Sequence, residues 1–291
     1  MSSITIDRDR CNLCGICIDA CVRRILKEEN EAIVVTDPTQ CLLCGHCKAV
    51  CPVDAPQLEA YRNSEFIEVP SGEDIPDPDK LLAFFRSRRS IRRYRAQPVE
   101  REKIEMIIEA ARFAPTGGNR QHIEHVVVQS KDKLIEIRDI AIDVLADQAE
   151  RIFRAIEKNR AQEGMLPESL QMALLYMESW RQLARLRNEG TDWLFYDAPA
   201  LIVSHMLPLG NTSEVVDAGL SSMQMVLMAE TLGLGTCFCG LLIFAAETEP
   251  RIKEILQIPR EHIAPVSFLL GYPDIKYLRL VSRRRARVQW L

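Results

Sequence analysis

Eight of the chain's ten cysteines lie near its start, spaced as ligands of metal clusters. They form two runs with gaps of two, two and three residues, and each cysteine of the first run recurs thirty positions later. Thiolate sulfur suits iron–sulfur clusters, and two-residue gaps let one short loop supply three corners of a cubane while a distant cysteine supplies the fourth. The spacing therefore predicts two 4Fe-4S clusters.

The fourth cysteine of each run is expected to ligate the other cluster. The predicted ligand sets are Cys11, Cys14, Cys17 and Cys51 for one cluster, and Cys41, Cys44, Cys47 and Cys21 for the second. Zinc sites and disulfides are the alternatives, but zinc ribbons use pairs of close cysteines and disulfides need an oxidising compartment. The stretch resembles a two-cluster bacterial ferredoxin, except that Val22 stands where a second proline would follow. His46, inside the second run, is expected to be a neighbour of the cluster and not a ligand.

The composition gives no reason to expect a nucleic-acid or membrane partner. The 291 residues suffice for a small module and one domain of ordinary size, and the net charge is -4. The best candidate for a membrane span, Ala198–Leu209, is short and contains Ser204 and His205. The Met-Ser-Ser start lacks a secretory pattern, so we expect a cytoplasmic, reduced protein.

An acidic, proline-rich stretch separates the cysteine-rich part from the rest. The internal repeat ends at about Tyr61, and Val69–Asp79 contains prolines that disfavour a helix. We therefore predict a two-cluster domain at 1–65, a linker at 66–79, and a second domain at 80–291 with a helical insertion at about 131–190. Within the first domain, short strands are expected at Ile4–Asp7 and Ala32–Val35.

Helix and strand patterns run through the second domain. Asp79 is expected to cap a helix, and another, amphipathic helix starts near Pro98. The insertion is predicted to hold two amphipathic helices broken near Gly164 and Pro167. Gly233-x-Gly235 half matches a dinucleotide fingerprint, but a third glycine and a preceding strand are missing, which excludes a Rossmann unit. The remaining predicted elements are strands at His125–Gln129, Ala200–Met206 and Ala264–Leu270, and helices at Val215–Leu232 and Glu249–Leu256.

Arginine side chains are dense between residues 86 and 94. This stretch holds five arginines and two serines. Guanidinium groups beside a hydroxyl can bind a phosphate monoester, because the guanidinium fork matches phosphate oxygens. A basic patch is more often a solvated face, so the stretch alone leaves both interpretations open.

Four blocks, in order along the chain, together resemble the nitroreductase family of FMN-dependent flavoproteins. They are Arg88-Arg89-Ser90-x-Arg92, Ala114-Pro115-Thr116-x-x-Asn119-x-Gln121, Gly233-x-Gly235-Thr236-Cys237-x-Cys239-Gly240, and Leu270-Gly271-Tyr272-Pro273 followed by Arg283 to Arg285. The similarity extends from about Leu81 to the C-terminus. It is closer still to family members that carry an N-terminal two-cluster ferredoxin module. The resemblance implies an α+β protein, in which a small ferredoxin-like domain is joined to a nitroreductase-like α/β FMN domain with a mixed sheet flanked by helices.

The resemblance also implies roles at FMN, whose reduced form fixed backbone dipoles can stabilise. The implied residues are Arg88, Ser90 and Arg92 at the phosphate and ribityl chain with Arg89 beside them, Asn119 and Gln121 at the ring or ribityl hydroxyls, Thr116 as a further cofactor-binding residue, Cys237, Cys239 and Gly240 as backbone donors to the flavin, and Arg283 and Arg285 returning from the tail to the phosphate. Thr116 replaces the family's usual serine. No residue is assigned as an indispensable acid or base.

Three features depart from the family pattern or have a simpler explanation. His122-Ile123 stands where many members have Pro-Trp, which changes the expected pocket wall. Cys237 and Cys239 could form a redox pair, but a buried apolar role is favoured because so short a loop strains a disulfide. In the insertion, core packing is the simpler explanation for four residues that could otherwise line a substrate pocket, namely Met172, Tyr176, Met177 and Trp180.

Together the two modules predict an enzyme that links one-electron carriers to two-electron chemistry. FMN transfers a hydride or two single electrons, whereas each cluster passes one electron at a time. The expected function is an FMN- and iron–sulfur-dependent oxidoreductase acting on a small organic acceptor with a nitro, ene or related group. We also expect a homodimer, NAD(P)H as a possible donor, and a possible donor protein such as a ferredoxin. The alternatives are a redox relay or sensor that serves a protein partner, and a dehalogenase-like or flavin-fragmenting enzyme of the same fold.

Overall fold

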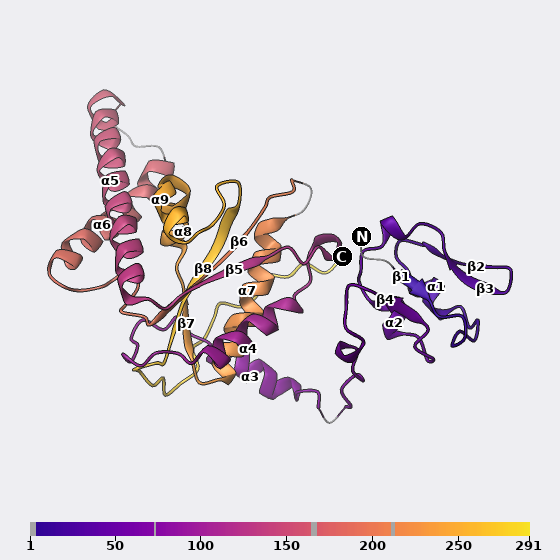
Figure 1. Ribbon diagram of the computed structural model, residues 1–291. Helices are drawn as coiled ribbons and strands as arrows, with labels where there is room; N and C mark the ends of the chain where they lie inside the picture. Colours follow the sequence, from indigo (N-terminus) through magenta and orange to yellow (C-terminus); the bar gives the residue numbers. More distant parts are fainter. Residues whose placement is uncertain (1–3, 73, 164–167, 211–212) are drawn as a thin grey trace. The chain divides into compact units, whose positions relative to one another are not determined.

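The computed structural model describes residues 4–72, 74–163, 168–210 and 213–291, and the chain divides into two compact units (Figure 1). Unit 1 comprises residues 1–77 together with 116–120, and unit 2 comprises residues 78–115 and 121–291. None of the helices within the described residues is long and apolar enough to cross a membrane.

Unit 1 is built from short elements between the cysteine loops. Two of its strands, β1 and β3, lie where the sequence predicts them. Their antiparallel partners β4 and β2 were not predicted, because Pro56-Gln57-Leu58 and Leu26-Lys27-Glu28-Glu29 lack an apolar alternation. The elements in order are β1 Ile4–Ile6, α1 Ile16–Ala20, β2 Leu26–Glu29, β3 Ala32–Val35, a 3-10 turn at Pro38–Gln40, α2 His46–Ala49, β4 Pro56–Leu58 and a 3-10 turn at Asn63–Glu65.

The thirty-residue sequence repeat of unit 1 is also a repeat of backbone conformation. Leu13 and Leu43 have φ of 61° and 52°, and Gly15 and Gly45 have φ of 75° and 74°. A left-handed conformation is unfavourable for leucine, so its occurrence in both runs reflects a demand of the loop and not a local preference. Both cysteine loops therefore wrap in the same way before α1 and α2 begin.

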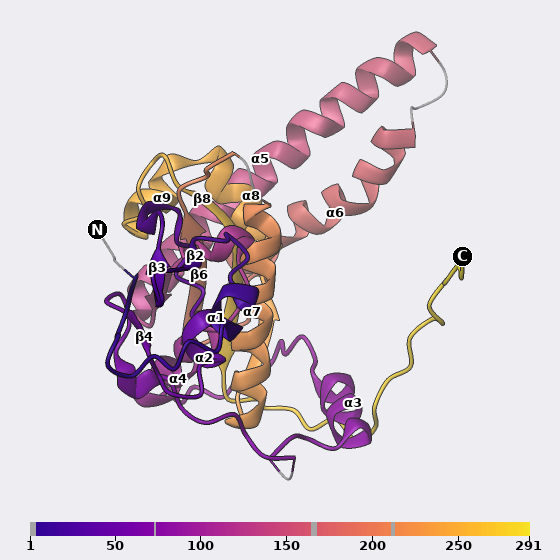
Figure 2. The ribbon, with the colours of Figure 1, turned by 90° about the vertical axis from the view of Figure 1, so that its right-hand side faces the viewer.

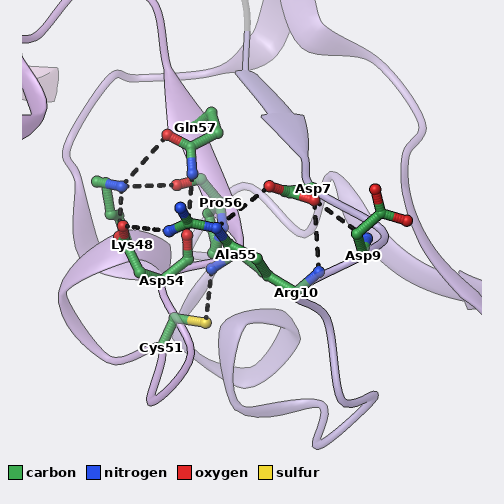
Figure 3. Close-up of polar contacts among 9 residues, drawn as sticks. All are labelled: Asp7, Asp9, Arg10, Lys48, Cys51, Asp54, Ala55, Pro56 and Gln57. Carbon is green, nitrogen blue, oxygen red and sulfur yellow. Dashed lines mark hydrogen bonds and ion pairs between the residues drawn. The ribbon is translucent and has the colours of Figure 1, made fainter.

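A buried lysine fastens the end of the second cysteine run. Lys48 is 4% exposed, and its ammonium contacts the Asp54 carboxylate, the carbonyl of Pro56 at 3.1 Å and the Gln57 amide oxygen at 3.5 Å (Figure 3). Arg10 reaches the same carboxylate at 3.2 Å. A buried ammonium is tolerated only when it is paired and hydrogen-bonded, so this network fixes the chain that follows Cys51.

Unit 2 is organised around a four-stranded sheet with the order β5-β6-β8-β7. All neighbouring strands in it are antiparallel, whereas the isolated bridge between Ser90 and Thr236 beside β7 is parallel. The elements are α3 Pro78–Ser87, α4 Arg101–Arg112, a 3-10 turn at Gly117–Asn119 whose residues belong to unit 1, β5 Glu124–Val128, α5 Lys131–Glu163, α6 Glu168–Asn188, β6 Ala200–Met206, α7 Glu214–Thr231, β7 Gly235–Phe238, α8 Gly240–Thr248, α9 Pro250–Ile255 and β8 Ile263–Gly271.

Helices cover both faces of this sheet. Along β6, Ala200 and Ile202 pack with α4 and α7, while Leu201 and Val203 face α5 and α8. Successive residues of a strand point to opposite faces, and a strand buried on both faces has a continuous apolar sequence. Figure 1 shows α4 and α7 on one side of the sheet and α5, α8 and α9 on the other.

The insertion forms the long helices α5 and α6, which pack along each other (Figure 2). The break expected near Gly164 and Pro167 lies outside the described residues. The prediction for Asp79 was wrong, because α3 begins at Pro78 and places Asp79 in its first turn. Strand β7 and helix α8 were also missed, since one is four residues long and the other is apolar on all sides.

Replacing Lys48 by alanine should loosen the chain around β4. The substitution leaves the Pro56 carbonyl without its donor, and hydrogen bonds to charged groups contribute about 1.5–3 kcal/mol each. The amides of residues 54, 55, 57 and 58 should then exchange hydrogen about 10- to 100-fold faster, measured by mass spectrometry on anaerobically purified protein. Lys27→Ala, which removes an exposed lysine of β2, is the matched control; equal exchange in the two variants would contradict the role of Lys48.

Candidate functional site

The eight N-terminal cysteines line two separate cavities, four in each. Cys11, Cys14, Cys17 and Cys51 line the first, and Cys21, Cys41, Cys44 and Cys47 line the second. Each cavity thus takes three cysteines from one run and the fourth from the other, the grouping expected from the spacing. His46 is exposed and lies at the second cavity.

The environment of these sulfurs fits metal clusters. Burial raises the pKa of Cys17, and Cys51 and Cys11 add to the rise, while burial raises the pKa of Cys47 to about 11. Thiols that oppose one another's ionisation need a cationic centre to hold them as thiolates. Backbone N–H groups also point at two of the sulfurs: Leu43 donates to Cys41 Sγ at 3.4 Å and Ala55 to Cys51 Sγ at 3.3 Å. Hydrogen bonds to the sulfur ligands tune the reduction potential of an iron–sulfur cluster.

In unit 2, the arginine-rich stretch is held as an extended segment beside β7. Ile91 N–H donates to the Thr236 carbonyl at 2.9 Å. Further along, Arg95 N–H donates to Tyr272 and Asp274 N–H donates to Arg93, both at 2.9 Å. These bonds fix the segment on both sides, so its side chains alternate as in a strand.

The alternation divides the predicted phosphate residues into two groups. Burial raises the pKa of the Cys237 thiol. The charges of Arg92 and Arg88, and hydrogen bonds from Ser90 and Arg92, act in the opposite direction and lower this pKa. Arg89 and Ile91 instead line a cavity of about 400 Å³ with Glu230, Pro273 and residues 275–280. Arg88, Ser90 and Arg92 therefore gather at Cys237, and Arg89 lies on the other side of the segment.

The side near Cys237 carries unused polar capacity. Among the residues that the structure describes, neither Arg88 nor Arg92 forms an ion pair with a carboxylate, and Arg92 lies 5.9 Å from the ring centroid of Tyr196. Tyr94 continues the same alternation, and its buried hydroxyl has no hydrogen-bond partner within the described part of the chain. Uncompensated guanidinium groups next to an unsatisfied buried hydroxyl fit a phosphate- and hydroxyl-bearing ligand.

Tyr94 was not among the predicted site residues, and His122 was noted only as a departure at the expected pocket wall. The signal for Tyr94 is its place two residues after Arg92, which becomes informative only once the segment is known to be extended. The signal for His122 is its departure from the usual family residue. Both of its ring nitrogens are buried and unpartnered among the described residues.

The Cys237–Gly240 segment offers fewer free amides than expected. Cys239 N–H donates to the Ser267 carbonyl at 2.9 Å, and the Ser267 hydroxyl donates to the Cys239 carbonyl at 2.9 Å. Gly240 is the first residue of α8, where backbone N–H groups lack partners within the helix. Of the expected backbone donors, Gly240 is thus better placed than Cys239.

The remaining predicted residues lie elsewhere. Thr116 and Asn119 belong to unit 1, where the Asn119 amide donates to the carbonyls of Leu42 and Leu43 at 2.9 and 3.0 Å. Gln121 belongs to unit 2 and has a φ of 51°. The described contacts do not bring Arg283 or Arg285 to residues 88–92; both lie on the exposed tail after β8 (Figure 2).

The insertion residues are mainly packing residues. Met177 is 3% exposed and packs with Ala149 and Ile156, and the Trp180 ring lies 5.2 Å from that of Phe244. Tyr176 is exposed. The side chain of Met172 lies outside the described residues. Core packing accounts for Met177 and Trp180.

A family model for the nitroreductase family matches residues 85–272, which is more than half of the chain. The chain belongs to the nitroreductase family. A model for a 4Fe-4S dicluster domain matches residues 3–52, so this family member carries a ferredoxin-like domain at its N-terminus. The first matched range contains Arg88–Arg92 and Cys237. The second contains all eight N-terminal cysteines.

The chain is also similar to individual reductases and to a ferredoxin. A 4-nitrobenzoate reductase of Nocardioides sp. is 25% identical over 220 residues, covering 70% of this chain and 84% of the relative. An FMN reductase (NAD(P)H) of Bacillus subtilis is 27% identical over 199 residues, covering 67% of this chain and 66% of the relative. A ferredoxin of Methanothermococcus thermolithotrophicus is 36% identical over 55 residues, covering 18% of this chain and 92% of the ferredoxin.

Solved structures show the same fold for the larger domain. An FMN-bound nitroreductase from Bacteroides fragilis aligns with a TM-score of 0.53 and 19% identity, covering 73% of this chain and 98% of that one. A second, from Desulfitobacterium hafniense, aligns with a TM-score of 0.52 and 23% identity, covering 74% and 100%. These structures show the fold, whereas the family match identifies the chain as an oxidoreductase of the nitroreductase family with a fused dicluster domain.

Cys239, the residue that follows β7, should be unreactive in the folded protein. Burial raises the pKa of Cys239 from its ordinary value of 9.0 to about 12, so its thiolate fraction at pH 8 falls roughly a thousandfold. Iodoacetamide applied anaerobically should leave Cys239 unmodified in the folded protein and modify it after unfolding, as read by peptide mass spectrometry. Alkylation of folded Cys239 at the rate of a free cysteine would show a reactive thiol.

Proposed function

We propose that this protein is an electron-transfer flavoenzyme in which two 4Fe-4S clusters and an FMN serve one catalytic cycle. The observation that carries the proposal is the joining of a dicluster domain, with four cysteines on each of two cavities, to a nitroreductase domain with an uncompensated arginine and serine cluster. Clusters pass single electrons, and bound FMN supplies hydride or two-electron chemistry. One chain with both groups converts between the two modes.

Side chains from the extended segment bind the cofactor in this proposal. Arg88 and Arg92 hold the FMN phosphate as charge-assisted donors, and the Ser90 hydroxyl adds a third contact. Tyr94 directs its unpaired hydroxyl at the same ligand. The backbone N–H of Gly240, at the start of α8, supplies a fixed dipole toward the flavin.

The proposed substrate is a small organic acceptor with a nitro, ene or related group. Support comes from the named relative of Nocardioides sp., which is a 4-nitrobenzoate reductase. The FMN reductase relative supports NAD(P)H as a possible donor, and the fused dicluster domain supports a donor protein of the ferredoxin type.

The proposed assembly is a homodimer. Arg283 and Arg285 lie on the exposed tail after β8, and no described contact joins them to residues 88–92 of their own chain. A second copy is the partner to which these guanidinium groups would contribute. Analytical ultracentrifugation of the FMN-loaded protein decides between monomer and dimer.

Substitutions in the arginine segment should affect FMN binding according to their side. Arg88→Ala and Arg92→Ala each remove a charged hydrogen bond worth about 1.5–3 kcal/mol, so the Kd for FMN should rise about 10- to 100-fold, as measured by ultrafiltration of free FMN. Arg89→Ala, on the opposite side, should change the Kd less than about threefold.

Arg93→Ala is the matched control for these variants. Arg93 is exposed and lies 3.7 Å from Asp274, and its loss should leave FMN binding unchanged. A rise in Kd for Arg89→Ala as large as that for Arg88→Ala would mean that the alternation does not select the FMN ligands.

Turnover with separate donors tests the function itself. The isolated holoprotein should reduce a nitroaromatic acid anaerobically when driven by reduced ferredoxin, and Cys14→Ala, at an exposed cluster cysteine, should abolish this rate. FMN content measured in the same variant separates loss of electron entry from loss of flavin. Absence of small-molecule turnover with any donor, together with reduction of a partner protein, would instead support a redox relay or sensor.

A further inference from the structure

Three metal-ligand side chains meet at one end of the sheet in unit 2. Glu124, His205 and His262 each offer a ligand atom, and these atoms all lie within 4.8 Å of one another. None of the three belongs to the arginine segment or to the cysteine loops. Their residue types, two imidazoles and one carboxylate, are those of many zinc sites.

The strand register explains why they converge. Glu124 opens β5 and is the direct cross-strand partner of His205 on β6. On the other side of β6, Met206 pairs with Ile263, the residue after His262. The register between β6 and β8 shifts between Ser204 and Met206, an irregularity that redirects side chains locally. Strands β5 and β6 therefore present one ligand each, and the residue just before β8 presents the third, at the same end of the sheet.

Their geometry suits a shared ion. His205 Nδ1 and His262 Nδ1 are 2.9 Å apart, and His262 Nδ1 is 3.9 Å from a Glu124 carboxylate oxygen. Ligands at about 2.0–2.1 Å from a zinc ion are themselves separated by roughly 3–3.5 Å, so only small side-chain adjustments are needed. The two imidazoles alone can form one hydrogen bond, which leaves the carboxylate outside that pair.

Burial and anchoring prepare the site. His205 is 4% exposed, His262 is partly buried and Glu124 is exposed, so two ligands are fixed by packing while the third leaves a side open to water. The Lys253 ammonium donates to the His262 carbonyl at 3.1 Å and holds the turn before β8. A water molecule can complete a tetrahedron from the open side.

We propose that Glu124, His205 and His262 bind a divalent transition metal of the zinc type, with water as the fourth ligand. The ion joins the ends of β5, β6 and β8. These three neighbouring strands contribute residues to the core on both faces of the sheet. Strand β7 pairs with the far end of β8, at residues 268–271, so this site is distinct from the region around Cys237. The site acts on the stability of unit 2 and does not depend on the proposed redox function.

The test measures zinc on the complete holoprotein. Protein purified anaerobically with its clusters should be dialysed against graded micromolar Zn²⁺ and analysed for zinc and iron by mass spectrometry. We expect one zinc per chain beyond the iron content. Glu124→Gln and His262→Gln should each weaken binding at least about tenfold, since loss of a ligand costs no less than loss of a supporting contact. These two positions are less buried than His205, so their variants should fold.

Glu261→Gln is the matched control, because Glu261 is an exposed carboxylate next to His262 that lies outside the trio. X-ray absorption at the zinc edge should show nitrogen and oxygen ligands at about 2.0–2.1 Å. The proposal is overturned by folded holoprotein that binds no zinc, by equal zinc affinity in all variants, or by a sulfur-only shell that places the metal on the cysteines.

Discussion

Gathering eight thiols within fewer than eighty residues is the constraint on which the first unit depends. Its buried aliphatic residues number only a few, chiefly Ile4, Ile25, Leu26, Ile33 and Leu58. Domains of this size rarely reach stability through a hydrophobic core alone and commonly use metals or disulfides. Three features hold sulfur atoms around two cavities. They are the strained left-handed leucines at positions 13 and 43, the N–H groups that face Cys41 and Cys51, and the buried Lys48. Folding of this unit is therefore coupled to its metal content in the account proposed here.

The second unit solves a different problem, because it must leave polar groups unsatisfied where a cofactor binds. Its core is closed on both faces of the sheet by helices, as the alternation along β6 shows. At the edge of that sheet, an extended segment pinned to Thr236 displays Arg88, Ser90, Arg92 and Tyr94 on one side. Buried polar atoms without partners are rare in proteins, and within the described residues the Tyr94 hydroxyl near Arg92 is one of them, which supports the proposed cofactor site.

The sequence was sufficient wherever local spacing determines the answer. The gaps between cysteines predicted how the eight cysteines divide between two cavities, and apolar runs located β6, α7 and β8 to within a residue or two. It was insufficient wherever a tertiary contact decides. The strands β2 and β4 are visible only through pairing, and the division between Arg88 and Arg89 follows from a bond to β7 almost 150 residues away. The convergence of Glu124, His205 and His262 likewise depends on the order of strands, which no local pattern encodes.

The measurement that tests the central claim most directly is an anaerobic coulometric titration of the holoprotein, followed by absorbance and by electron paramagnetic resonance. A chain that holds FMN and two clusters should accept about four electrons, two at the flavin and one at each cluster. Addition of a nitroaromatic acceptor should then reoxidise the flavin and the clusters together. Uptake of about two electrons with no cluster signal, or clusters that stay reduced while the flavin turns over, would contradict the account.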